Sequence, residues 1–128
     1  MNESKELHST VICTQGGRIL FVRKEAPEWS LPGGKIEPGE EHLEAARREL
    51  SEETTLQLSS AKFIGHYVYQ SEEHYLYQMP VEPTIVPHPS DEIVECRWFT
   101  PSELELVNVK PNNLDLISRA ERFLRNRN

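Results

Sequence analysis

The segment Gly34–Leu56, GKIEPGEEHLEAARRELSEETTL, decides the fold of this chain. It continues from a Pro-Gly-Gly turn at residues 32–34, and its pattern predicts a helix that begins near Glu40. Leu43, Ala46 and Leu50 recur at i, i+3 and i+7, which places them in one apolar stripe. We therefore expect this helix to pack Leu43, Ala46 and Leu50 against a hydrophobic core.

A row of acidic residues lies beside the apolar stripe. Glu49, Glu52 and Glu53 are spaced at i, i+3 and i+4, so they are neighbours on the helix surface. Like charges at this spacing repel each other, and the row costs stability unless a cation lies among the carboxylates. Mg²⁺ prefers oxygen ligands and often joins carboxylates to substrate phosphates. The alternative is a solvated acidic helix with an ordinary i,i+4 pair of Arg48 and Glu52.

The fixed spacing of the segment favours the metal site over the solvated helix. Gly34, Glu40, the Arg48-Glu49 pair and the Glu52-Glu53 pair, together with apolar Leu50 and Leu56, match a known pattern. This segment resembles the Nudix box of the Nudix (MutT-like) hydrolases, which cleave nucleoside diphosphates linked to another moiety. One position departs from the pattern, because Thr55 stands where the box has a glycine. If that glycine is left-handed, we expect the chain to leave the helix here by another backbone geometry.

The resemblance implies roles for the residues of the box. It implies that the metal ligands are the carboxylates of Glu49, Glu52 and Glu53 and the backbone carbonyl of Gly34. Arg48 would hold a glutamate in place by a salt bridge. Gly33, Gly34, Glu40 and Leu50 would shape the turn and the helix. The expected cofactor is Mg²⁺, with Mn²⁺ as an alternative.

The catalytic base and the substrate contacts are less closely specified by the sequence. We expect Glu53 from the box or an acid outside it, Glu92 ahead of Asp91, to be the base, with Glu52 and Arg48 completing the catalytic group. Alternatively, Asp91 and Glu92 are solvated acids at the start of a strand. The residues predicted to contact substrate are Arg23 and Lys24 for a phosphate, and Tyr67 and Asn112 for a base.

Simpler interpretations exist for each predicted substrate contact. Arg23 and Lys24 could be exposed basic residues at a strand end. Tyr67 alternates with Tyr69, and such alternation is more typical of a packed sheet face than of a base-stacking surface. Asn112 or Asn113 could cap the last helix. The five histidines show no ligand spacing.

Composition limits the classes of function that remain. The 128 residues are enough for one domain, and we expect a single Nudix domain over residues 1–128. The net charge of −7 disfavours duplex nucleic acid and anionic membranes as partners. The two cysteines, Cys13 and Cys96, lack a metal-type spacing, so a reducing cytoplasm is the expected location.

The order of predicted elements indicates an α/β fold. We expect strands over residues 8–13, 18–23, 61–70, 74–79 and 93–99, a proline-rich loop over 80–89 and a short helical turn after Pro101. A last helix is predicted with an apolar face of Leu114, Ile117, Ala120 and Leu124, helped by Leu116 and Phe123. The resemblance implies an α/β/α sandwich with a mixed sheet, the box helix on one face and the last helix on the other.

The expected function is metal-dependent hydrolysis of a phosphoanhydride bond in a small nucleotide or related diphosphate. A nucleoside triphosphate or a dinucleotide polyphosphate would be a suitable substrate, and the protein would act as a monomer or a homodimer. The alternative is a catalytically silent module of the same fold that senses a nucleotide or binds a partner.

Overall fold

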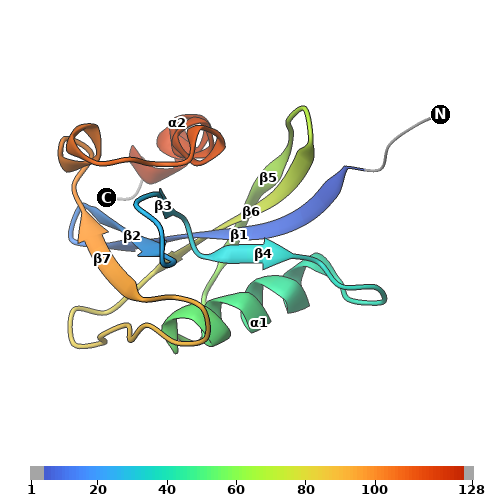
Figure 1. Ribbon diagram of the computed structural model, residues 1–128, viewed down its shortest axis with the longest axis horizontal. Coiled ribbons are helices and arrows are strands. Elements are labelled where there is room, and N and C mark those ends of the chain that lie inside the picture. Colours follow the sequence, from blue (N-terminus) through green and yellow to red (C-terminus); the bar gives the residue numbers. More distant parts are fainter. Residues whose placement is uncertain (1–4, 126–128) are drawn as a thin grey trace.

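A mixed sheet lies between two helices in the computed structural model, which describes residues 5–125 (Figure 1). Helix α1 (His42–Thr54) covers one face of the sheet, and helix α2 (Pro111–Arg125) covers the other. This arrangement confirms the predicted α/β/α sandwich. No helix in the described part of the chain is both long and apolar enough to cross a membrane.

Strand β1 is the centre of the seven-stranded sheet. It pairs antiparallel with β2 and β4 and parallel with β6, and the main path of the sheet has the order β3-β2-β1-β6-β5. Strand β7 pairs with β2, and a short 3-10 helix, η1 (Glu103–Leu106), follows it. The strands are β1 (Glu6–Gln15), β2 (Arg18–Arg23), β3 (Trp29–Ser30), β4 (Gly33–Lys35), β5 (Lys62–Val68), β6 (Glu72–Pro80) and β7 (Glu95–Phe99).

Alternation along β1 divides the apolar residues between two cores. Successive side chains of a strand point to opposite faces of the sheet. Val11 and Cys13 therefore pack with Leu50 on the α1 side, while Ile12 packs with Leu116 on the α2 side. Because both faces of β1 are buried, its middle section is a continuous apolar run.

Helix α1 begins where a capping box satisfies its first backbone groups. Glu41 precedes the helix, and its backbone N–H donates to the Glu44 carboxylate at 2.9 Å. Ala46 and Leu50 are fully buried as predicted, but the prediction for Leu43 was wrong, because its side chain is 40% exposed. Ala45 is buried instead, so the buried face is rotated away from Leu43.

The end of α1 corrects a second expectation. Without the box glycine, the chain was expected to leave the helix by a different backbone geometry. Thr55 instead adopts the left-handed conformation, with φ 64° and ψ 4°, and its N–H donates to the Ser51 carbonyl at 3.0 Å. The turn is therefore kept, at the cost of placing a β-branched residue where glycine is favoured.

Helix α2 starts one residue before the expected caps. Pro111 is its first residue, a position that suits proline, so Asn112 and Asn113 lie inside the first turn and neither caps the helix. Leu116 and Ala120 are fully buried, whereas Leu114 is 43% exposed, which contradicts its predicted place on the apolar face. Ile117 and Leu124 pack at the edge of the core, and the side chain of Phe123 lies outside the described part.

Strands β5 and β6 are displaced relative to the predicted pair. The turn between them was expected at residues 71–73, but Glu72 and Glu73 already belong to β6. Strand β5 is shorter than predicted, and a register shift between Phe63 and Gly65 interrupts its pairing. As a result, Glu72 lies in a regular strand beside β1.

Candidate active site

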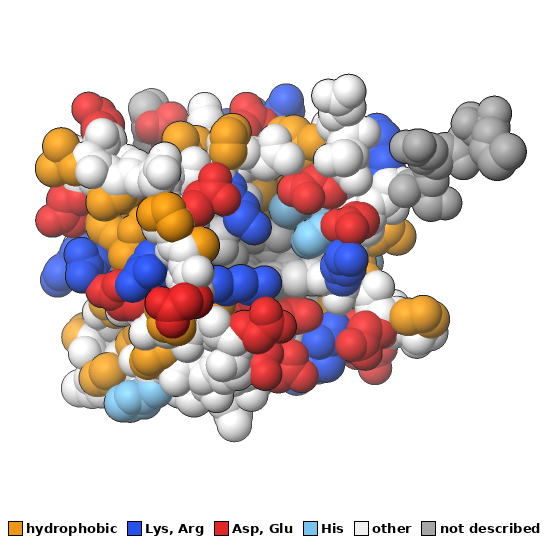
Figure 2. Space-filling view, in the orientation of Figure 1, with side chains coloured by type: hydrophobic (Ala, Val, Ile, Leu, Met, Phe, Trp, Pro, Cys, Tyr) orange, Lys and Arg blue, Asp and Glu red, His pale blue; other side chains and the backbone are white. Residues whose placement is uncertain are grey.

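A cavity of about 440 Å³ opens beside the box helix. Figure 2 shows a hollow with acidic side chains on one side and histidines on the other. The acidic side is formed by α1 and the segments before α1 and β7, and the opposite side by β1, β6 and the start of α2. The described lining residues are His8, Thr10, Lys24, Ser30, Leu31, Gly33, Gly34, Lys35, Glu37, Arg48, Glu49, Glu52, Glu53, Glu72, His74, Asp91, Glu92, Ile93, Lys110 and Asn113.

Arg48 joins the loop before α1 to the acidic row. Its Nε and Nη2 donate to the two oxygens of Glu40 at 2.7 and 3.0 Å, a bidentate pair. Its Nη1 donates to Glu49 at 3.0 Å and to Glu52 at 3.3 Å. A hydrogen bond to the Lys35 carbonyl at 3.1 Å completes the set. One guanidinium therefore fixes the turn and two of the three box carboxylates.

The two glycines of β4 lie in close contact with the carboxylates of Glu53 and Glu49. Gly33 N–H donates to Glu53 Oε1 at 3.0 Å. At Gly34, an added Cβ would lie 2.5 Å from the carboxyl carbon of Glu49, so any side chain there would displace that carboxylate. The Pro-Gly-Gly turn thus places backbone groups against Glu49 and Glu53.

Burial makes these carboxylates costly to ionise. Desolvation raises the pKa of Glu53 to about 8, although the Gly33 hydrogen bond lowers it. Desolvation also raises the pKa of Glu49, and Arg48 opposes this shift. A carboxylate with a raised pKa beside other acids is stabilised in its ionised form by a nearby cation.

The donor set suits a hard divalent cation. Glu49, Glu52 and Glu53 offer carboxylate oxygens, and Gly34 lies directly beneath Glu49. Among residues 5–125, the three box carboxylates do not approach one another as closely as Glu6, His8 and Glu72, whose ligand atoms lie within 4.8 Å.

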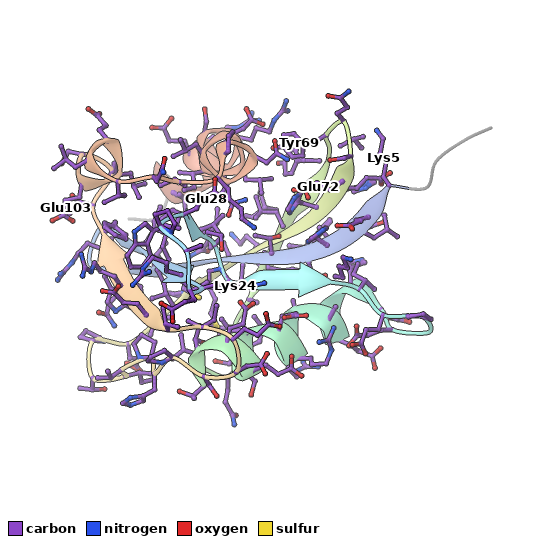
Figure 3. The ribbon with its side chains drawn as sticks, viewed as in Figure 1. Lys5, Lys24, Glu28, Tyr69, Glu72 and Glu103 are labelled. Atoms are coloured by element: carbon purple, nitrogen blue, oxygen red, sulfur yellow. The ribbon has the colours of Figure 1, made fainter. Side chains whose placement is uncertain are left out.

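The predicted substrate contacts are divided between the cavity and the rest of the surface. Lys24 lines the cavity, and its Nζ lies 3.8 Å from Glu92, which also lines it (Figure 3). Arg23 instead forms an ion pair with Glu95 at 2.9 Å. Tyr67 packs against the core on the α2 side, below the guanidinium of Arg119. Neither Arg23 nor Tyr67 is among the described residues that line the cavity.

Asn113 occupies the place that was predicted for Asn112. Asn112 does not line the cavity, and its Nδ2 donates to Glu72 Oε1 at 3.1 Å. Asn113 is buried at the cavity wall, and its Oδ1 accepts the Leu31 N–H at 2.7 Å. Sequence reasoning did not distinguish the two, although Pro111 could have indicated the first residue of α2.

Sequence reasoning also missed the two histidines that line the opposite side of the cavity, His8 and His74. His8 and His74 are direct partners in the parallel pairing of β1 and β6, and their rings stack with centroids 5.0 Å apart. Their spacing along the chain gave no ligand signal, because the parallel register that joins them is not encoded locally.

Comparisons with known proteins agree with this geometry. The NUDIX domain model matches residues 8–120. A Bacillus subtilis (strain 168) protein described as "Putative 8-oxo-dGTP diphosphatase" is 35% identical over 106 residues, covering 80% of this chain and 70% of the relative. "Phosphatase NudJ" of Shigella boydii is 29% identical over 118 residues, covering 84% and 74%. A solved structure described as "Crystal structure of putative nudix hydrolase family member from Chromobacterium violaceum" superposes with a TM-score of 0.84 at 24% identity, covering 98% of this chain and 82% of that one.

The chain belongs to the Nudix family. It is an enzyme of that family, a pyrophosphohydrolase that cleaves a phosphoanhydride bond in a nucleoside diphosphate derivative. Nudix hydrolases generally depend on a divalent cation, which agrees with the acidic cavity. The named relatives are phosphatases and diphosphatases, which favours the enzyme over the silent nucleotide-sensing alternative.

Proposed function

We propose that this chain hydrolyses nucleoside triphosphates, with an oxidised purine nucleoside triphosphate as the first candidate substrate. The observation that carries the proposal is that the box carboxylates and Lys24 line the same cavity as a polar wall suited to a nucleoside. The choice of an oxidised purine rests on the 35% identical relative, which is named for 8-oxo-dGTP. A small nucleotide is thus the proposed partner, and a single Nudix domain over residues 1–128 the proposed unit.

We infer that Mg²⁺, or Mn²⁺ in its place, is held by Glu49, Glu52, Glu53 and the carbonyl of Gly34. Seven acidic and four basic side chains line the cavity within the described residues, so it attracts cations more than free phosphate. A bound divalent cation would neutralise phosphate charge and lower the pKa of a coordinated water. The protein residues would hold the metal and the substrate phosphates in the geometry that the reaction needs.

Arg48 is assigned to positioning, because its contacts go to Glu40, Glu49 and Glu52. Lys24 is assigned to a substrate phosphate, because its ammonium extends over the acidic side of the cavity (Figure 3). Asn113 replaces Asn112 as the candidate for contact with the base, since Asn113 lines the cavity and Asn112 does not.

The general base is assigned to Glu53 ahead of Glu92. Glu53 is buried, and Gly33 fixes one of its oxygens, so the other is oriented. The Glu92 side chain is 73% exposed and pairs with Lys24 at 3.8 Å, which gives it less fixed geometry. Asp91, the third candidate, also lines the cavity.

The test is a substrate panel with Mg²⁺. The wild type, Glu53→Gln and the control Glu73→Gln are incubated with 8-oxo-dGTP, dGTP, ADP-ribose and a dinucleotide polyphosphate, and the products are separated by chromatography: a nucleotide with phosphate or pyrophosphate from the triphosphates, AMP with ribose 5-phosphate from ADP-ribose, and two mononucleotides from the dinucleotide polyphosphate. We expect metal-dependent turnover that is fastest for 8-oxo-dGTP, and a loss of 100-fold or more, on the order of the contribution of a general base, in Glu53→Gln. Glu73 bonds to His66 outside the cavity, so its variant should keep full rate.

The same variants separate a base from a metal ligand. If Glu53→Gln loses rate but keeps its Mg²⁺ affinity, Glu53 acts as a base; loss of both properties identifies a ligand. Glu92→Gln is expected to retain most of the activity. Absence of turnover for every compound, with thermal stabilisation by a nucleotide, would contradict the proposed reaction and support a sensing role.

Two further expectations complete the proposal. The free thiols of Cys13 and Cys96 agree with a cytoplasmic location, because neither is paired within the described residues. The protein is proposed to act on free nucleotides, as a monomer or a homodimer, with no duplex nucleic acid or membrane as a partner.

A further inference from the structure

The wall of the cavity opposite the box contains an ordered hydrogen-bond network. His74 is only 4% exposed, and each of its ring nitrogens has a partner. Nε2 lies 2.7 Å from Glu72 Oε1, and Nδ1 lies 2.7 Å from the Thr10 hydroxyl. A carboxylate only accepts hydrogen bonds, so Nε2 carries the proton and Nδ1 accepts from Thr10. Burial lowers the pKa of His74, which agrees with this neutral tautomer.

This network fixes one carboxylate oxygen of Glu72 and leaves the other available. Oε1 accepts from His74 Nε2 at 2.7 Å and from Asn112 Nδ2 at 3.1 Å. Oε2 has no hydrogen bond from any residue between 5 and 125, and His8 Nε2 lies 3.7 Å away from it. Glu72 lines the cavity, and Figure 3 shows it at the start of β6. The side chain is therefore held in one orientation by His74 and Asn112.

The composition of this wall indicates how a ligand is recognised there. Within the described lining there is no Phe, Tyr or Trp, and Leu31 and Ile93 are the only large apolar residues. Stacking between aromatic rings cannot supply specificity in such a wall, except for contact with the face of a histidine. Hydrogen bonds to fixed polar groups must supply it, and a site that leaves a buried polar group unpaired discriminates against the wrong ligand.

We propose that Glu72 determines substrate specificity by accepting, at Oε2, a hydrogen bond from the non-phosphate part of the nucleotide. The donor is the exocyclic 2-amino group of a guanine base or the 2′-hydroxyl of the sugar, since both present an N–H or O–H to a carboxylate. This assignment rests on the proposed function, because it places a nucleotide with its phosphates at the box. His74 and Asn112 are positioning residues, which act through Glu72.

The substitution Glu72→Gln tests this role with little change in shape. His74 and Asn112 keep the amide oxygen of the new side chain at the Oε1 position. The amide nitrogen then lies at the Oε2 position, so an acceptor becomes a donor. Glu73→Gln is the matched control, because Glu73 is the next residue on β6, bonds to His66 at 2.8 Å and is outside the cavity lining.

The assay compares GTP with ITP, which lacks the exocyclic amino group, and with dGTP, which lacks the 2′-hydroxyl. Mg²⁺ is the only metal present, because Glu6, His8 and Glu72 could also gather a transition metal. We expect the wild type to prefer GTP over one of the two analogues by about 10- to 100-fold in kcat/KM, the range for a hydrogen bond to a charged group. The analogue that is disfavoured identifies the donor as base or sugar.

In Glu72→Gln the ratio of kcat/KM for GTP to kcat/KM for the disfavoured analogue should fall to about 1. Glu73→Gln should keep the wild-type ratio. A purely structural role for Glu72 would lower the rate with all three nucleotides and leave the ratio unchanged, which would overturn the inference. Equal rates for all three nucleotides in the wild type would also overturn it, whether or not the variant folds.

Failure of the proposed function gives a different result. If no nucleotide is hydrolysed, the proposed reaction is contradicted, and the dissociation constants of the three nucleotides are compared by calorimetry. If the wild type binds GTP more tightly than one of the analogues and Glu72→Gln binds both equally, the role of Glu72 in binding is still supported. Equal dissociation constants in the wild type would overturn it.

Discussion

Thr55 ends α1 with a backbone conformation that few threonines adopt. Its φ of 64° lies in the left-handed region, where a Cβ atom crowds the backbone and a branched one does so more. The Nudix box has glycine at this position, and glycine pays no steric cost there. The retained turn shows that the surrounding packing, including buried Leu56, outweighs the strain at one residue.

Thr55→Gly is expected to stabilise the protein by about 1 kcal/mol, because the relief of left-handed strain exceeds the added entropy of the unfolded chain. Urea unfolding measures the difference. The control is Gln57→Gly, an exposed site without a positive φ, which should be destabilising. Equal effects of the two substitutions would show that Thr55 is not strained.

Glu40 gives a pH-dependent contribution to stability. Its hydrogen bonds from Arg48 lower its pKa to about 2 from the ordinary value of 4.5. Because the folded pKa is depressed, the contribution is complete above about pH 4.5 and is lost as the pH falls towards 2. Glu40→Gln should therefore lower the urea midpoint at pH 7.

The difference between Glu40→Gln and the wild type should stay constant from pH 7 to about 5 and shrink below about 4. Glu82→Gln, an exposed loop variant, is the control and should follow the wild type throughout. A difference that persists unchanged at pH 3 would contradict the assigned ion pair between Glu40 and Arg48.

Single residues also show where prediction from sequence stops. The spacing of Glu49, Glu52 and Glu53 was enough to place them on one helix face, because helical geometry is local. Leu43 and Leu114 were misplaced because they lie at the margin of an apolar stripe, where a small rotation exposes a side chain. The choice between Asn112 and Asn113 depended on the first residue of α2, and Pro111 at that position could have indicated it.

At the scale of elements, β4 and α1 form one unit that presents the box. Strand β4 lies against β1 through the register Thr10↔Gly33, and Arg48 of α1 donates a hydrogen bond to the carbonyl of Lys35, the last residue of β4. At Gly33 an added Cβ would lie 2.3 Å from the Ser9 carbonyl oxygen, which is closer than any real contact. The absence of a side chain at Gly33 is therefore required for β4 to join the sheet.

Gly33→Ala is expected to destabilise the protein by about 2 kcal/mol or more, because the backbone of β1 cannot move away from a new methyl group. Gly39→Ala is the control. Gly39 has a φ of 81° but open space around it, so only the conformational cost of about 1 kcal/mol applies. Thermal or urea unfolding measures both. A smaller effect at Gly33 than at Gly39 would contradict the close approach of β4 and β1.

The elements were predicted well where the pattern was strong. The hairpin of β1 and β2 follows from an apolar run on each side of Gly16 and Gly17, both of which have positive φ. The start of β6 was misplaced, because Glu72 and Glu73 are polar and resemble turn residues. Their place in the strand comes from pairing with Glu6 and Leu7, which lie 66 positions earlier in the sequence.

At the scale of the whole molecule, the net charge of −7 is concentrated in part around the cavity. A cation that binds only the folded state stabilises it in proportion to the logarithm of its concentration. We expect Mg²⁺ at 100 times its dissociation constant to add about 2.7 kcal/mol to the free energy of unfolding. Thermal unfolding with and without Mg²⁺ measures this effect.

The substitution Glu52→Gln should reduce the stabilisation by Mg²⁺, because it removes a carboxylate that lines the cavity. Glu82→Gln changes the net charge equally at a loop site outside the cavity lining and should keep the full effect. Equal loss in the two variants would show that Mg²⁺ acts through general charge screening and not through the box.

The sequence predicted one side of the cavity and missed the other. The acidic side comes from one continuous segment, so its spacing was readable. The opposite side is formed by β1, β6 and the start of α2. Nothing in the local sequence indicated that His8 would stack on His74 or that Glu72 would accept a hydrogen bond from Asn112. A cavity side that is formed by distant segments can be predicted only when the register of the sheet is known, and a single sequence does not give that register.

The parallel pairing of β1 with β6 has a consequence for synthesis on the ribosome. A nascent chain that has reached residue 71 already contains the entire box, yet it lacks the strand that carries His74 to Thr10, 64 positions away. Its acidic helix can form, but the cavity that would hold a nucleotide cannot. Competence to bind must therefore arise late in translation, after β6 and the start of α2 have emerged.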